Sequence, residues 1–411
     1  MHLARIIEQA VRTDGRRVLA TLIRLTGDFD AAEDALQEAY TRALSSWRED
    51  GIPDNPGGRL STVARRIAID RMRRDRSVPL EDGPSLPAVE IEDPDLSGVD
   101  DDRLRLLFVC CHPALAPDAR CALALKTLGG LTTREIARAF VEPEPTTAQR
   151  LVRAKKKIRE ARIPYEVPPR AKLGERVETV LSVLYLIFNE GYASTDAPSL
   201  MRPDLAAEAI RLARLAAALL PESAEAKGLL ALMLLTDARR GARVTADGDF
   251  VPLEEQDRSL WDRAFIDEGA RILDEALALR APGSYQTQAA IAALHVTAPS
   301  AAQTDWPQIA ALYRALLRTT DNPVVELNAA VAHGFAFGAD QALVWLTRIE
   351  DQGRLADYHL LPAARGAFLH RLGRDAEAAD AYRGAIALTT NPAEKRYLEK
   401  KLEACGNPGQ R

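Results

Sequence analysis

Cysteine is scarce in this chain of 411 residues, which holds only Cys110, Cys111, Cys121 and Cys405. Four thiols placed so unevenly do not make the disulfide framework of a small secreted protein. Long apolar runs are also missing, since no stretch approaches the roughly 20 residues that a membrane helix needs. An amphipathic stretch follows Met1, where a signal peptide would have an apolar core. We therefore expect a soluble cytoplasmic protein.

Catalytic signatures are missing as well. The sequence has no P-loop, GxSxG, HExxH or CxxC pattern, and its six histidines are scattered. Cys110, Cys111 and His112, together with Cys121, invite a zinc or redox interpretation. Adjacent ligands suit a single tetrahedral ion poorly, however, and cysteine is a common core residue. We expect core packing here, with no metal, no cofactor and no enzymatic activity.

Aromatic residues make up only 5% of the chain, whereas alanine, leucine and arginine are abundant. This composition favours an all-α fold, and the length predicts two or three domains. The net charge is -5, so a surface for nucleic acid has to be local and balanced by acidic segments elsewhere.

An acidic segment interrupts the helical patterns. Residues 77–102 hold nine acids, four prolines and no base, which predicts an extended linker. A second interruption, "IPYEVPPR" at 163–170, precedes a long remainder rich in alanine and leucine. The sequence therefore predicts a helical domain at 1–77, a linker at 78–102, a second helical domain at 103–165 and a third at 170–411.

Residues 1–77 offer one acidic helix face and one basic helix. Leu36, Tyr40, Ala43 and Trp47 have 4, 3 and 4 spacing and form an apolar face. The opposite face carries Asp34, Gln37, Glu38, Thr41 and Arg42. Further on, residues 59–76 contain seven arginines against two aspartates.

A helix-turn-helix pattern follows the linker. Thr132 or Thr133 can cap a helix whose Ile136, Ala137 and Phe140 face inward; "VEPEP" at 141–145 stops it; and Thr146 or Thr147 can cap the next helix. Residues 146–162 hold seven cations and one acid, with Leu151, Ala154 and Ile158 on the inner face. The exposed face has no alternating acids for i,i+4 pairing, which favours DNA binding over a merely solvated helix.

The polar residues of this second helix divide by position. Those near its start are expected to reach base edges, and the later cations are expected to hold phosphates. The first group is Thr146, Thr147, Gln149, Arg150 and Arg153; the second is Lys155, Lys156, Lys157 and Arg159.

The series "AEDALQEAYTRAL", "LSTVARRIAIDRMRR", acidic linker and "LTTREIARAF...TTAQRLVRAKKKIR" resembles an extracytoplasmic-function (ECF) sigma factor, the promoter-recognition subunit of bacterial RNA polymerase. The resemblance covers residues 1–163, as sigma region 2 and sigma region 4. Each motif is moderately specific by itself, whereas their order and spacing together are strongly specific.

The resemblance implies roles for these surfaces. The acidic face (Asp34, Gln37, Glu38, Thr41, Arg42) would dock on a basic coiled coil of core RNA polymerase. The basic helix would open and hold the single-stranded minus-10 element of promoter DNA, through Arg59, Arg65, Arg66, Asp70, Arg71, Arg73 and Arg74. The helix-turn-helix would read the minus-35 element in the major groove.

Two departures and the linker leave alternatives open. The family commonly has Trp where Arg59 stands and Asn where Arg66 stands, so minus-10 specificity is altered or passes to a neighbour. The linker would thread the RNA exit path, where its nine acids could occupy a basic channel until the transcript displaces them; plain disorder is the alternative.

Repetition marks the remaining residues. Five groups share 4 then 3 spacing: Ala209/Ala213/Ala216, Gly269/Leu273/Ala276, Ile309/Tyr313/Leu316, Ala342/Leu346/Ile349 and Ala378/Tyr382/Ala385. Ala330 and Gly366 precede the last two groups by 12 residues each. The distances along the sequence from each of the last four groups to the next bracket the tetratricopeptide period. This spacing predicts stacked helix pairs. Two stretches do not fit a plain repeat: a hairpin around Asp247-Gly248, and "LIFNEGYAS" with Asn189, Glu190 and Tyr192.

In the most similar subgroup of ECF sigma factors, a tetratricopeptide-like extension follows region 4 and is thought to regulate it, so an unknown regulatory protein or ligand is expected there. A DNA-binding activator with a tetratricopeptide sensor domain is the alternative, and a peptide-binding adaptor is a third. Binding to core polymerase separates them, because an activator binds duplex DNA by itself and an adaptor binds neither.

Overall fold

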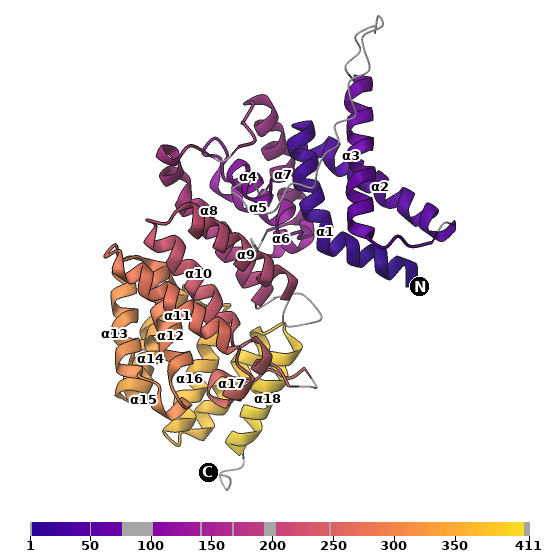
Figure 1. The fold of residues 1–411 in the computed structure, drawn as a ribbon. Helices are drawn as coiled ribbons and strands as arrows, with labels where there is room; N and C mark the ends of the chain where they lie inside the picture. Colours follow the sequence, from indigo (N-terminus) through magenta and orange to yellow (C-terminus); the bar gives the residue numbers. More distant parts are fainter. Residues whose placement is uncertain are drawn as a thin grey trace, which may run out of the picture. The chain divides into compact units, whose positions relative to one another are not determined.

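The computed structural model describes residues 2–49, 51–75, 102–139, 142–166, 168–192, 203–245 and 248–406, which fold into helices (Figure 1). Within these ranges the only β-type pairing is one antiparallel bridge, between Val244 and Phe250. The all-α prediction is confirmed. The expected linker, except for Asp102, lies outside the described residues. No helix in the described ranges has the length and apolar character needed to cross a bilayer.

The chain divides into two compact units, Met1–Leu184 and Tyr185–Arg411, with the division inside helix α8. The first unit holds the two sigma-like segments. Its helices are α1 (His2–Thr26), α2 (Phe29–Glu49), α3 (Pro56–Asp75), α4 (Asp102–Cys110), α5 (Pro117–Thr127), α6 (Thr133–Ala139), α7 (Glu144–Glu160) and the first part of α8 (Arg170–Tyr192).

Helices α1, α2 and α3 pack on one another. Asp28 caps α2, because its Oδ1 accepts hydrogen bonds from the backbone N–H groups of Asp30 (2.8 Å) and Ala31 (3.0 Å). The expected apolar stripe of α2 is turned inward, and Trp47 packs with Ala43 and with Leu60 of α3. The polar face of α2 is therefore exposed to solvent.

The helix-turn-helix forms from α6 and α7. Thr132 and Glu135 make a capping box, with Glu135 N–H to Thr132 Oγ1 at 3.2 Å and Thr132 N–H to Glu135 Oε2 at 2.6 Å. The inner residues Ile136, Ala137, Leu151, Ala154 and Ile158 are buried, as expected. Phe140 lies outside the described residues.

The expected start of α7 is wrong. The helix begins at Glu144, with Pro143 as its N-cap residue, and neither Thr146 nor Thr147 caps it. Pro145 is accommodated in the first turn because proline lacks only an N–H that has no helical partner there. The acid-and-proline segment that was expected to be a break thus supplies the first turn of the second helix.

The second unit is a series of antiparallel helix pairs (Figure 1). Its helices are the rest of α8, α9 (Pro203–Leu219), α10 (Ala224–Asp237), α11 (Arg263–Ala278), α12 (Ser284–Thr297), α13 (Trp306–Leu316), α14 (Pro323–Phe337), α15 (Ala339–Gln352), α16 (Leu360–Arg371), α17 (Asp375–Leu388) and α18 (Pro392–Gly406). Short 3₁₀ turns occur at Arg240–Ala242, Leu253–Glu255, Arg258–Leu260 and Ala301–Gln303.

The residues of the five repeat groups are buried, apart from Tyr313, which is partly exposed. Small residues allow close approach between paired helices. A Cβ added to Gly366 of α16 would lie 3.0 Å from the Tyr382 ring of α17, and one added to Gly334 of α14 would lie 2.5 Å from the Cβ of Ala342 in α15. The repeat pattern therefore identified the inner faces of tetratricopeptide-like pairs.

The segment around the Val244–Phe250 bridge, residues 244–256, reaches α18. Asp249 accepts hydrogen bonds from Arg396 (2.6 Å) and Lys400 (2.9 Å). Phe250 meets Tyr397 edge to face, with ring centroids 5.6 Å apart. The expected hairpin is thus present as a bridge; Asp247 lies outside the described residues, so its turn type stays a prediction.

Tyr192, at the end of "LIFNEGYAS", anchors α8 to the chain after α10. The Arg243 guanidinium lies 3.7 Å from the centre of the Tyr192 ring and donates a hydrogen bond to the Tyr192 carbonyl. Arg239 donates to the Tyr192 hydroxyl at 3.3 Å. These contacts give Tyr192 a structural role, which explains its place in the motif without a binding function.

Candidate functional site

The exposed face of α2 presents the residues expected to contact core polymerase. Asp34, Gln37, Thr41 and Arg42 are exposed and Glu38 is partly buried. The Glu38 carboxylate accepts hydrogen bonds from Arg42 (2.5 Å) and from Arg71 of α3 (2.7 Å). Partial burial alone would raise the pKa of Glu38, but these two guanidinium groups outweigh it and hold that pKa below its usual value.

Helix α3 carries the residues expected to bind the minus-10 element. Arg59, Arg66, Asp70, Arg73 and Arg74 are exposed, and Arg65 and Arg71 are partly buried. Arg71 is held by Asp34 (3.5 Å) and Glu38. Arg74 donates to the carbonyl of Asp70 at 3.2 Å. Arg59, Arg65, Arg66 and Arg73 have no acidic partner within the described ranges, so their guanidinium groups are available to phosphates.

Helix α7 presents only part of its expected DNA-reading set. Thr146, Gln149, Arg153, Lys156 and Lys157 are exposed. Thr147 is buried, and its hydroxyl donates to Glu142 Oε1 at 2.5 Å. Arg150 donates to both oxygens of the same carboxylate, at 2.6 Å for Nη2 and Oε2. Glu142 therefore connects the turn before α7 to the start of that helix. It also binds Thr147 and Arg150, two of the residues expected to read bases.

The later cations of α7 meet the acidic beginning of α2. Lys155 Nζ lies 2.9 Å from Glu33 and 3.1 Å from Asp30, and Arg159 Nη1 lies 2.9 Å from Asp28. The Lys155 side chain is only 14% exposed. In this structure the two cations bind carboxylates of the same chain and not phosphates. The three acids belong to the segment before the expected polymerase-binding face, and the sequence pattern gave them no role.

The pKa values of these groups reflect the pairing. Burial lowers the pKa of Lys155, but Glu33 and Asp30 outweigh burial and raise it above its usual value. Burial raises the pKa of Asp28, whereas the N–H donors of α2 and the Arg159 guanidinium together lower it below its usual value. Lys155 and Asp28 are therefore charged at neutral pH, as an ion-pair contact requires.

Other contacts join the two segments of this unit. The Tyr165 hydroxyl donates to the carbonyls of Ala20 (3.0 Å) and Asp102 (2.8 Å). Asp102 also pairs with Arg24 (2.8 Å) and accepts a hydrogen bond from Thr21 (2.9 Å). The contact between α7 and α2 therefore belongs to a wider polar interface.

Comparisons with known proteins follow the same division of the chain. Residues 10–78 match the family model "Sigma-70 region 2", and residues 105–158 match "Sigma-70, region 4". The chain thus carries the two sigma-70 regions, and over them it is similar to extracytoplasmic-function (ECF) sigma factors. Helices α2 and α3 are thus part of sigma region 2, and α6 and α7 are part of sigma region 4, so the resemblance seen in the motifs is confirmed.

Its relatives show how far the likeness reaches. A probable ECF RNA polymerase sigma factor SigI of Mycobacterium tuberculosis is 31% identical over 153 residues, 36% of this chain and 52% of that protein. ECF RNA polymerase sigma factor SigE of Mycolicibacterium smegmatis is 27% identical over 155 residues, 37% of this chain and 60% of that protein. An uncharacterized protein of Rhizobium meliloti is 41% identical over 404 residues, 97% of this chain and 95% of its own length. No solved structure matches.

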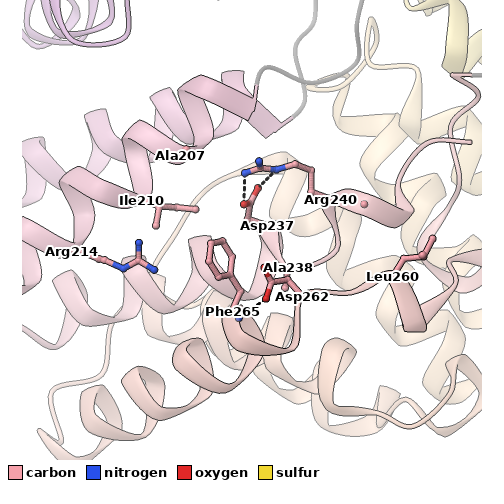
Figure 2. Close-up of a pocket in the computed structure, with 10 residues that line it drawn as sticks. Ala207, Ile210, Arg214, Asp237, Ala238, Arg240, Leu260, Asp262 and Phe265 are labelled. Carbon is pink, nitrogen blue, oxygen red and sulfur yellow. Dashed lines mark hydrogen bonds and ion pairs between the residues drawn. The ribbon is translucent and has the colours of Figure 1, made fainter. Parts of the chain in front are cut away.

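The part of the chain that follows region 4 begins with a further family segment. Residues 176–277 match a family of unknown function, DUF6596. Within it α9, α10 and α11 border a cavity of about 380 Å³ (Figure 2). Figure 2 shows Arg240 turned toward Asp237, to which it donates at 2.8 Å through Nε, and the Phe265 ring between them and Arg214. The cavity therefore has both charged and apolar lining, and the charges of this pair are satisfied by each other.

Two of the three cysteines in region 4 lie in its core, whereas Cys121 is partly exposed. Cys110 and Cys111 are buried, and burial raises the pKa of Cys110 to about 12. His112 Nδ1 accepts a hydrogen bond from the N–H of Ala114 at 3.1 Å. These positions agree with the expected packing role.

Proposed function

We propose that this ECF sigma factor binds core RNA polymerase through the exposed face of α2 and holds the melted minus-10 strand on α3. One observation carries the proposal. On a helix beside a carboxylate-bearing one, the guanidinium groups of Arg59, Arg65, Arg66 and Arg73 have no acidic partner among the residues that the structure describes. Free guanidinium groups can neutralise the backbone of a separated strand. Carboxylates on the neighbouring helix suit a basic partner.

Region 4 supplies minus-35 recognition in this proposal. Thr146, Gln149, Arg153, Lys156 and Lys157 are exposed in the free chain, and Lys155 and Arg159 are added once their contacts with α2 open. The acids that hold Lys155 and Arg159 adjoin the proposed polymerase-binding face of α2, so in this proposal engagement of core and release of α7 are coupled. The unbound sigma factor would then have weakened affinity for duplex promoter DNA.

The extension regulates this process in our proposal, through a ligand or protein partner. The cavity between α9, α10 and α11 is the candidate ligand site, since it combines Arg214 and Arg240 with apolar walls from Ile210 and Phe265. Because Arg240 is paired with Asp237, a ligand in this cavity has to compete with Asp237 for Arg240.

In vitro transcription with core polymerase on fragmented genomic DNA, followed by transcript sequencing, tests the function. We expect discrete start sites that need both core and the sigma factor. Asp34→Lys should abolish most of this activity, whereas Asp380→Lys, an exposed acid of α17, should leave it unchanged. Binding of duplex DNA without core, together with no captured polymerase, would instead identify a helix-turn-helix activator.

Comparing the full chain with a variant that ends after Tyr192 tests regulation. A cut near Arg170 would be unsuitable, because Val180 and Leu181 of α8 are buried and Arg176 donates to the Phe108 carbonyl of α4 at 3.4 Å. A changed transcript yield at equal sigma concentration is expected. Identical yields and start sites from both proteins would contradict regulation by the extension.

A further inference from the structure

Three side chains from three different helices meet at the end of the helical repeats. They are His370 in the last turn of α16, Asp375 at the first position of α17 and Cys405 in the last turn of α18. His370 Nδ1 lies 2.7 Å from Asp375 Oδ1 and 3.8 Å from Cys405 Sγ. All three ligand atoms lie within 4.8 Å of one another.

We propose that His370, Asp375 and Cys405 bind a zinc ion. Imidazole nitrogen, carboxylate oxygen and thiolate sulfur are the three donor types that zinc accepts in proteins. A hard ion such as Mg²⁺ would not choose the sulfur. Two anionic ligands and one neutral ligand also balance the charge of a divalent cation.

The two separations from His370 fit a tetrahedral ion after small side-chain movements. Bond lengths of about 2.0 to 2.3 Å place neighbouring ligand atoms about 3.3 to 3.7 Å apart. The His370–Cys405 distance is already close to this range. The His370–Asp375 pair, now at hydrogen-bond distance, has to lengthen by less than about 1 Å, which a rotation of the carboxylate can provide.

Burial leaves the cluster accessible on one side. Cys405 is 8% exposed, while the side chains of His370 and Asp375 are 35% and 19% exposed. Three protein ligands leave the fourth zinc position to water or to a small ligand. Burial and the Asp375 carboxylate raise the pKa of the Cys405 thiol, so zinc binding has to displace the thiol proton.

Cobalt titration of the full-length protein tests the site, with the chain reduced, freed of metal by a chelator and kept under anaerobic conditions. One equivalent of Co²⁺ should produce a thiolate-to-cobalt charge-transfer band and the visible bands of tetrahedral Co²⁺, and Zn²⁺ should remove both. Cys405→Ser should lose the charge-transfer band. Cys121→Ser, which changes the only other thiol that is not fully buried, should retain it.

His370→Gln and Asp375→Asn provide a second route if the serine variant folds poorly. Loss of a direct ligand should weaken zinc binding at least about 100-fold, beyond the 10- to 100-fold typical of outer-shell changes. Zinc should also raise the unfolding temperature of the wild-type chain but not of these variants.

No charge-transfer band in the wild-type chain, or an unchanged band in the serine variant, would show that the cluster is only a hydrogen-bonded packing contact. Unchanged zinc affinity in both His370→Gln and Asp375→Asn would overturn the proposal equally. Neither measurement uses polymerase or DNA, so this result is independent of the proposed sigma function.

Discussion

The two basic helices α3 and α7 look alike in the sequence but differ in the structure. On α3, Arg66 and Arg73 are exposed without acidic partners among the residues described. On α7, Lys155 and Arg159 are bound to carboxylates of α2, and Arg150 is bound to Glu142. The number of cationic residues therefore identifies a basic helix. Whether those cations are available to DNA depends on their ion pairs with carboxylates of the same chain.

The largest expected effect concerns the available charges. Arg66→Ala combined with Arg73→Ala should reduce open-complex formation at least about tenfold and should lower the salt dependence of promoter binding by about two phosphate contacts. Arg383→Ala, an exposed arginine of α17, is the matched control. Permanganate footprinting and a salt titration measure the two quantities, and an unchanged salt slope would contradict a phosphate role for these arginines.

A smaller and opposite effect is expected from freeing α7. Asp28→Asn with Glu33→Gln removes two of the acids that hold Arg159 and Lys155, while asparagine still caps α2. Ion pairs near a protein surface are individually weak, so duplex binding by the free chain should rise only about 2- to 30-fold. Fluorescence anisotropy measures it, and equal affinities in variant and wild type would exclude masking by this contact.

The smallest expected effect is that of pH. The pKa of Asp28 lies below its usual 3.8, so its contribution is present above that value and is lost as pH falls through the lowered pKa. The pKa of Lys155 lies above its usual 10.5, so its contribution is present below that value and is lost as pH rises through the raised pKa.

The contact between α7 and α2 should therefore stay unchanged between about pH 5 and pH 9 but weaken with added salt. Hydrogen exchange of α2 and α7 at several pH values and salt concentrations checks this, after correction for the intrinsic exchange rate. A loosening between pH 6 and pH 8 would mean that a group other than these carboxylates and amines controls the contact.

Sequence patterns correctly predicted the features that depend on interactions between residues close together in the chain. The apolar stripe ending at Trp47, the Thr132 cap and the buried small residues of the repeats all depend on spacing within one helix or one helix pair. Proline misled the interpretation at residues 141–145, because the same residue that ends a helix also fits its first turn.

Ion pairs between residues far apart in the chain could not be predicted from the sequence. Lys155 is separated from Glu33 by 122 positions, and no periodicity relates residues so distant. The cluster of His370, Asp375 and Cys405 was not predicted either, because Cys405 is 35 positions from His370 and the three residues form no ligand motif. The roles of the individual DNA- and polymerase-binding residues stay predictions.

The segment 244–256, bound to α18 through Asp249 and Phe250, changes how the extension should come apart. An open stack of repeats can fray from either end, since each pair touches only its neighbours. Here an early part of the stack is fastened to its last helix, so detaching the last pair also breaks contacts made some 150 positions earlier in the chain. We therefore expect the stack to unfold more cooperatively than an open one, and a protease should find fewer partly opened forms.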